Sequence, residues 1–127
     1  MATCTEITLK LPNSPGELER VFQRLTDEKV GIKAFLLDST GTLRLTVDNP
    51  LRAAGILTTH EYLIEKREVL IVQIPNEVGA LHTATRFVSS SGVNVEYAYG
   101  SSSDPGRIAA VVIAVDDIDR ASMIAGV

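Results

Sequence analysis

The order of polar and apolar residues along the chain predicts a mixed α+β fold. Residues 6–11 alternate between polar and apolar, which is typical of a half-buried strand. The next segment, to about residue 29, places apolar residues on one face of a helix: Leu18, Val21, Phe22 and Leu25. Two strands, 32–38 and 42–48, follow as a hairpin, and a short helix over 49–57 and a strand over 62–66 complete the order βαββαβ.

The second half of the chain repeats this order. Residues 68–74 form an almost continuous apolar run, as expected for a strand inside a sheet. A helix with an apolar face follows and ends near Gly92, and residues 108–115 form another buried strand. The connection over residues 100–106 takes the place of the tight turn in the first half.

The clearest sign of the repeat is the turn between the first strand and the first helix of each half. The sequence Leu-Pro-Asn-Ser-Pro-Gly-Glu-Leu at 11–18 returns 63 residues later as Ile-Pro-Asn-Glu-Val-Gly-Ala-Leu at 74–81. Gly16 and Gly79 allow the backbone to approach whatever lies over the helix start. The unpaired N–H groups of a first helical turn make each copy a candidate binding site for a carboxylate. We expect Ser14 to cap the first helix, with Pro15 at the first helical position, and Asn49 to cap the short helix that follows the hairpin.

We therefore predict two ferredoxin-like βαββαβ modules, residues 1–67 and 68–127, with helices covering one face of each antiparallel sheet. Modules of this size are marginal alone and should pack on one another. The second module ends with its last strand short or missing, which would leave 69–74 as an open edge. Either the segment 61–66 or a second chain would cover this edge, so a homodimer is expected.

Composition narrows the classes of function. The net charge of −4 argues against a nucleic-acid partner, and no apolar stretch is long enough to span a membrane. The start of the chain lacks the basic residues of a signal peptide, so a cytoplasmic location is expected. The single cysteine and the separated His60 and His82 form neither a metal site nor a catalytic triad. We expect no cofactor and no catalysis.

Both halves resemble the ACT domain, a ligand-sensing βαββαβ module of amino-acid metabolism, and the whole resembles stand-alone tandem ACT proteins. The likeness is carried by the two turns, 13–18 and 76–81, and by Gly92-Val93-Asn94-Val95 after the second helix. It implies an amino-acid ligand held where two modules meet. The candidate ligand-binding residues are Asn13, Ser14, Gly16, Leu18, Asn76, Glu77, Val78, Gly79, Ala80, Leu81, Asn94 and Val95.

The chemistry of these residues suits such a ligand. Backbone N–H groups of residues 79–81 are expected to hold a carboxylate, and Asn94 offers both a donor and an acceptor to an ammonium or polar group. Glu77 either pairs with an ammonium or simply complements the helix dipole. Lys33 is aligned with Asn94 and would alter the first site. The competing interpretation is that both glycines serve only the turn and close packing.

The hypothesis is a non-catalytic regulatory protein that senses an amino acid. One alternative is a regulatory subunit that docks on an amino-acid biosynthetic enzyme. The other is a small hydrolase, which rests only on the fact that ferredoxin-like folds host such enzymes.

Overall fold

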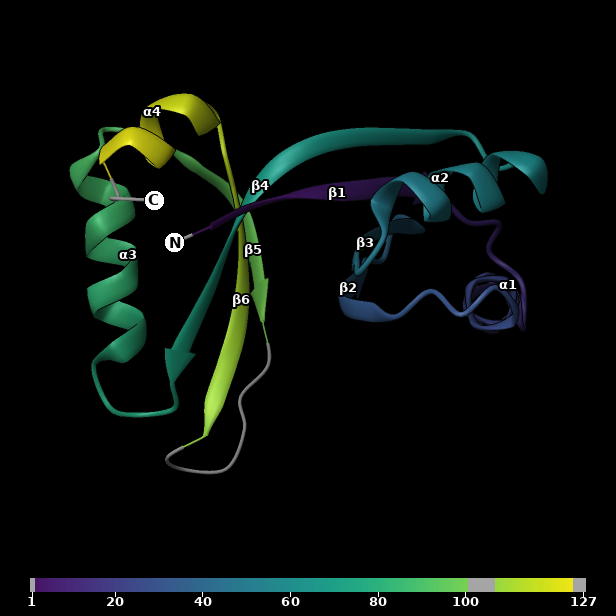
Figure 1. The fold of residues 1–127 in the computed structure, drawn as a ribbon, viewed down its shortest axis with the longest axis horizontal. Coiled ribbons are helices and arrows are strands. Elements are labelled where there is room, and N and C mark those ends of the chain that lie inside the picture. The colour runs from purple at the N-terminus through teal and green to yellow at the C-terminus, as the bar shows by residue number, and fades with distance from the viewer. Residues whose placement is uncertain (1, 101–106, 125–127) are drawn as a thin grey trace. The chain divides into compact units, whose positions relative to one another are not determined.

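The computed structural model describes residues 2–100 and 107–124 (Figure 1). Strands and helices follow one another in the predicted α+β order, which confirms the fold class. In chain order they are β1 (Ala2–Lys10), α1 (Glu17–Asp27), β2 (Ile32–Leu37), β3 (Thr42–Val47), α2 (Pro50–Thr59), β4 (Ile64–Pro75), α3 (Ala80–Ser90), β5 (Val95–Gly100), β6 (Ile108–Val115) and α4 (Ile118–Ile124). The predicted connection over 100–106 lies, apart from Gly100, outside the described residues.

The strands are hydrogen-bonded in the order β2-β3-β1-β4-β6-β5. By its contacts the chain divides into two compact units, which we call the first unit (residues 5–67) and the second unit (residues 1–4 with 68–127). Both β1 and β4 contribute residues to each unit. The division into modules 1–67 and 68–127 remains a prediction. By its contacts, the segment 1–4 is grouped with residues 68–127 and not with 5–67.

The first unit has a closed core between its helices and the sheet. Strands β1 and β3 pair antiparallel, with Ile7 opposite Leu45 and Leu9 opposite Leu43. All four side chains are buried, together with Val21, Leu25, Ala53, Ala54 and Leu57 from the helices α1 and α2. The helical stripe predicted from the sequence is therefore the face of α1 that packs on the sheet.

The second unit has a smaller core. Strands β4 and β6 pair antiparallel, with Leu70 opposite Ile113 and Val72 opposite Val111. Figure 1 shows α3 and α4 on the same side of these strands. The buried cluster comprises Leu70, Val72, Ala84, Val88, Ile113, Val115 and Ala121.

The predicted open edge at residues 69–74 is wrong. Strand β4 lies between β1 and β6 in the sheet, and Val69 and Leu70 are fully buried. The chain's own start, Ala2–Cys4, belongs to the second unit and to β1, so the sheet position expected to be vacant is taken by residues 2–4. The open edge was the main reason to expect a homodimer, and that reason no longer holds.

Helix caps follow the sequence in one case and depart from it in another. Asn49 caps α2 as predicted, because its Oδ1 accepts a hydrogen bond from the Arg52 N–H at 3.1 Å. Ser14 does not cap α1. The helix begins after Gly16, whose φ of 84° lies in the left-handed region, and the Ser14 hydroxyl instead donates to Glu17 Oε1 at 3.0 Å.

Candidate functional site

Backbone conformation shows which residues of the first half correspond to which residues of the second half. Gly16 and Gly79 precede α1 and α3 with φ of 84° and 87°. Lys29 and Gly92, just beyond the ends of the same helices, also have positive φ, 60° and 76°. In both pairs the second residue lies 63 positions after the first. The turn, the helix and its end therefore repeat with one constant offset.

The same offset continues into the next strand and corrects the placing of Asn94. The Gly31 N–H donates to Asp48 Oδ2 at 3.0 Å, and the Asn94 N–H donates to Asp116 Oδ1 at 2.9 Å. Asn94 is thus the counterpart of Gly31, and its alignment with Lys33 is wrong. The Asp116 N–H also donates to the Asn94 carbonyl at 3.1 Å, so the backbone of Asn94 is held by Asp116.

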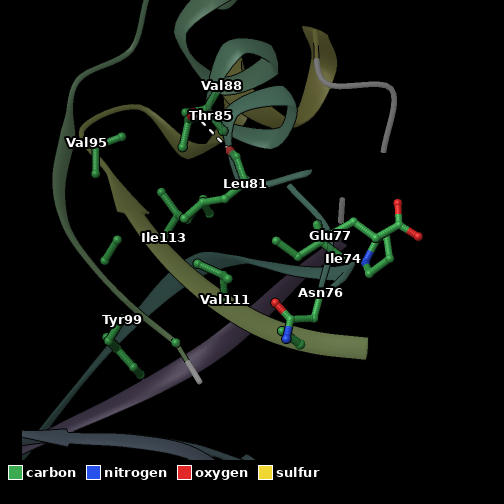
Figure 2. A pocket seen from close by; sticks show the side chains of 14 residues that line it. Ile74, Asn76, Glu77, Leu81, Thr85, Val88, Val95, Tyr99, Val111 and Ile113 are labelled. Carbon is green, nitrogen blue, oxygen red and sulfur yellow. Dashed lines mark hydrogen bonds between the residues drawn. The ribbon is translucent and has the colours of Figure 1, made fainter. Parts of the chain in front are cut away.

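A cavity of about 450 Å³ lies between α3 and the strands of the second unit (Figure 2). Figure 2 shows Leu81 and Val88 of α3 on one side, and Val111 and Ile113 of β6 on the other. Part of the cavity wall faces solvent: Leu81 is 53% exposed although it lies on the apolar face of its helix. The lining residues are Ile74, Pro75, Asn76, Glu77, Leu81, Thr85, Val88, Val95, Ala98, Tyr99, Gly100, Ala109, Val111 and Ile113.

The walls of this cavity are mostly apolar, and its amide and carboxylate side chains lie at the turn before α3. Asn76 is partly buried, and its backbone N–H donates to the Arg107 carbonyl at 2.7 Å. Glu77 is exposed and is the only charged side chain among the described lining residues. The Thr85 hydroxyl donates to the Leu81 carbonyl at 3.0 Å, so helix backbone rather than the cavity takes up its hydrogen bond.

The rest of the predicted second-half site faces another depression. Val78, Gly79 and Ala80 line a hollow of about 560 Å³ with Thr83 and Phe87. Of the three backbone donors predicted there, the Ala80 N–H donates to the Glu77 carbonyl at 3.2 Å, within the turn itself. The structure thus divides the predicted residues: Asn76, Leu81 and Val95 line the first cavity, Val78, Gly79 and Ala80 the second, and Glu77 both.

The predicted residues of the first half line a more polar depression of about 590 Å³. Asn13, Ser14, Gly16 and Leu18 lie there opposite the hairpin turn that contains Asp38. The pKa of Asp38 is lowered to about 2, chiefly because the Thr40 hydroxyl donates to its carboxylate, with further hydrogen bonds from the Thr42 backbone and the Arg44 side chain. Asp38 is therefore charged at neutral pH, and its hydrogen bonds organise the hairpin.

Sequence reasoning missed most of the apolar wall of the second-unit cavity. Thr85, Ala98 and Gly100 carry no motif, and strand spacing alone does not show that β5 lies opposite α3. A comparison of the two halves at a constant offset of 63 residues would have singled out these three positions. The first half has the larger residues Phe22, Phe35 and Leu37 at the corresponding places.

The described ranges contain neither a metal-binding cluster nor a membrane-spanning helix. No group of three or more His, Cys, Asp or Glu side chains is gathered there in a way that would hold a metal ion. Within those ranges, no helix has the length and apolar character needed to cross a membrane.

Part of the chain matches a known family. Residues 69–125 match the model of the ACT domain, and no curated protein sequence matches the chain. Protein BT0572 from Bacteroides thetaiotaomicron is similar in structure, with a TM-score of 0.86, 26% identity, and coverage of 96% of this chain and 85% of that one.

Two aspartate kinase proteins share the fold at lower identity. The regulatory subunit of aspartate kinase from Thermus thermophilus gives a TM-score of 0.67 at 20% identity, with coverage of 98% of this chain and 92% of that chain. Aspartokinase III of E. coli, in complex with lysine and aspartate, gives a TM-score of 0.59 at 16% identity. The match covers 98% of this chain but 30% of that one. At these identities the two matches show a shared fold. The match agrees with the resemblance indicated by the two turns: residues 69–125 match the ACT domain, and the chain has the fold of aspartate kinase regulatory domains.

Proposed function

We propose that the protein is a non-catalytic regulatory protein that binds an amino acid in the cavity under α3. The observation that carries this proposal is the position of the cavity. It adjoins the turn 76–81, which bears the ACT motif, and it lies inside the segment that matches the ACT domain. The predicted site between two modules stays a prediction, whereas this cavity lies within the second unit.

The chemistry of the lining supports an amino acid. The Glu77 carboxylate offers a partner for the ligand's ammonium group, and the Asn76 side chain carries both donor and acceptor atoms near the same end. The apolar wall of Leu81 and Val95 with the β6 side chains would receive the ligand's side chain. Asn13, Ser14, Gly16 and Leu18 would form a second, more polar site.

Thermal unfolding with each of the common amino acids in turn tests the proposal. A ligand at 100 times its Kd stabilises the folded state by about 2.7 kcal/mol, which raises the Tm of a chain of this size by on the order of 10 °C. We expect at least one amino acid to do so. If none raises the Tm, the proposal is wrong.

The second candidate function is that of a regulatory subunit docked on an amino-acid biosynthetic enzyme. The similarity to the regulatory subunit of an aspartate kinase favours this function. The present chain covers 92% of the length of that subunit. Purification of the tagged protein from its own cells tests it. A stoichiometric complex with an identified enzyme of this class would support docking, whereas a free protein that still responds to an amino acid would favour a stand-alone sensor.

We also propose a homodimer, now on different grounds. Strands β2 and β5 stand at the two ends of the strand order, and β2 exposes Phe35 (48%) and Leu37 (37%). An apolar edge strand of this kind is stabilised by pairing with a second copy. Light scattering at tens of micromolar should give about twice 13.7 kDa. A mass of one chain, with and without ligand, would contradict the proposal.

A further inference from the structure

The inner part of the second unit's cavity occupies a place that the first unit fills with its own side chains. Strand pairing proves the equivalence. Phe35 lies opposite Leu45 in the first unit, and Ala98 lies opposite Ile113 in the second. In the same way Leu37 lies opposite Leu43, and Gly100 lies opposite Val111. Ala98 and Gly100 are therefore the counterparts of Phe35 and Leu37.

The helices show the same change. Because Gly16 and Gly79 start α1 and α3 in the same conformation, Phe22 of α1 has Thr85 of α3 as its counterpart. The rings of Phe22 and Phe35 meet edge to face, with centroids 5.1 Å apart and planes at 77°. This aromatic pair fills the gap between α1 and β2. Its counterparts, Thr85 and Ala98, both line the cavity.

The consequence is visible in the exposure of the surrounding apolar side chains. Leu43 is fully buried, whereas its counterpart Val111 is only partly buried. Leu18 packs against the first core, whereas its counterpart Leu81 is 53% exposed. The three substitutions, Phe22 to Thr85, Phe35 to Ala98 and Leu37 to Gly100, remove more non-hydrogen atoms than a whole free phenylalanine contains.

The polar end of the cavity differs from the first unit in charge. Ser14, the counterpart of Glu77, donates its hydroxyl to Glu17, which also pairs with Arg20 at 2.7 Å. In the second unit Ala80 stands where Glu17 stands in the first, and Glu77 contributes a carboxylate at the rim. No described lining residue is basic. The rim therefore suits a ligand with a positive charge near its polar end.

We propose that the cavity takes a small molecule that carries an aromatic ring and an ammonium group, of which the aromatic amino acids are the main class. The ring occupies the volume that Phe22 and Phe35 fill in the first unit, against Leu81, Val88 and Ile113. The ammonium lies at the Glu77 rim. This inference rests on the proposed function and adds to it the class of ligand.

The test compares ligands on the wild-type protein by thermal unfolding and calorimetry. The ligands are L-phenylalanine, L-tyrosine, L-lysine, L-threonine, phenethylamine and 3-phenylpropanoate. We expect phenylalanine or tyrosine to raise the Tm most, phenethylamine to keep part of the effect, and 3-phenylpropanoate, which lacks the ammonium, to bind at least tenfold more weakly. If lysine or threonine raises the Tm and the ring compounds do not, the inference is wrong and the proposed function stands. If no amino acid acts, both fail.

A variant that fills the cavity completes the test. Ala98→Phe places a ring where the first unit has Phe35, and it should weaken phenylalanine binding at least tenfold while leaving the protein folded. Gly100 is unsuitable for this purpose, because a Cβ there would lie 2.9 Å from the Ala110 carbonyl oxygen. Thr85→Phe is the second filling variant, and Thr26→Phe, at an exposed position of α1, is its control. Unchanged phenylalanine binding in a folded Ala98→Phe or Thr85→Phe protein would overturn the inference.

Discussion

The two units have the same backbone pattern but fill it differently. Each has a turn with a left-handed glycine, a helix ending at a positive φ, and a strand anchored by an aspartate, Asp48 in one and Asp116 in the other. The first unit fills the inner part of the gap between helix and sheet with Phe22 and Phe35, and keeps a depression only at the turn end. The second leaves a cavity of about 450 Å³ in the same place. A repeat can therefore keep one copy as a packed scaffold while the other copy keeps room for a ligand.

The largest expected effect tests whether the first unit is the better packed of the two. Leu43→Ala removes a fully buried side chain from the first core and should lower the free energy of unfolding by about 3 kcal/mol. The matching change, Val111→Ala, truncates a partly buried side chain at the cavity wall and should cost less than about 1 kcal/mol. Urea unfolding of both variants measures the difference. Equal losses would contradict the comparison.

A second variant gives the first unit the residues that the second unit has at the corresponding positions. Phe22→Thr with Phe35→Ala removes the aromatic pair and should lower the free energy of unfolding by about 2 kcal/mol, less than for fully buried rings because Phe35 is 48% exposed. A double-mutant cycle should assign about 1 kcal/mol to the contact between the rings. A coupling energy near zero would show that the rings do not support one another.

Local pattern predicted the elements well, because each depends on neighbouring residues. The apolar stripe of α1 and the apolar run over 68–74 both became the expected elements, although the strands predicted over 62–66 and 68–74 form one continuous strand, β4. The role of Ala2–Cys4 in the second unit could not be predicted, since these residues carry little pattern and their partner in the sheet is distant in sequence.

The site was predicted less completely, for a physical reason. The motif residues Asn76, Glu77 and Leu81 do line the cavity, because a turn motif is local. Thr85 and Ala98 come together only through the packing of α3 over β5, which depends on strand register. Asn94 was misaligned because Gly92-Val93 resembles Gly31-Ile32 in sequence, whereas backbone conformation matches Gly92 with Lys29.

A smaller effect is expected at the cap of α2, which the sequence predicted. Asn49→Ala removes the acceptor of the Arg52 N–H and should lower the free energy of unfolding by about 1 kcal/mol. Asn49→Asp, which keeps the acceptor, is the matched control. A loss of similar size in both variants would show that the cap hydrogen bond is not the cause.

The smallest effect concerns the hairpin of the first unit and depends on pH. The pKa of Asp38 is lowered to about 2, so its charged form is favoured in the folded state. Its contribution is fully present above the ordinary aspartate pKa of about 3.9 and is lost as the pH falls through 2. The difference in Tm between wild type and Asp38→Asn should therefore be constant from pH 7 to 5 and shrink below pH 4. A difference that grows on acidification would contradict this account.

The central claim is that a ligand ring takes the place of the missing aromatic pair in the second unit. Nuclear Overhauser contacts between the ring protons of L-phenylalanine and protein methyl groups test it most directly. The account predicts contacts to Val88, Val111 and Ile113, and none to the buried methyl groups of Leu43 and Leu45 in the first unit. Saturable binding with ring contacts elsewhere, or with none to these three residues, would contradict it.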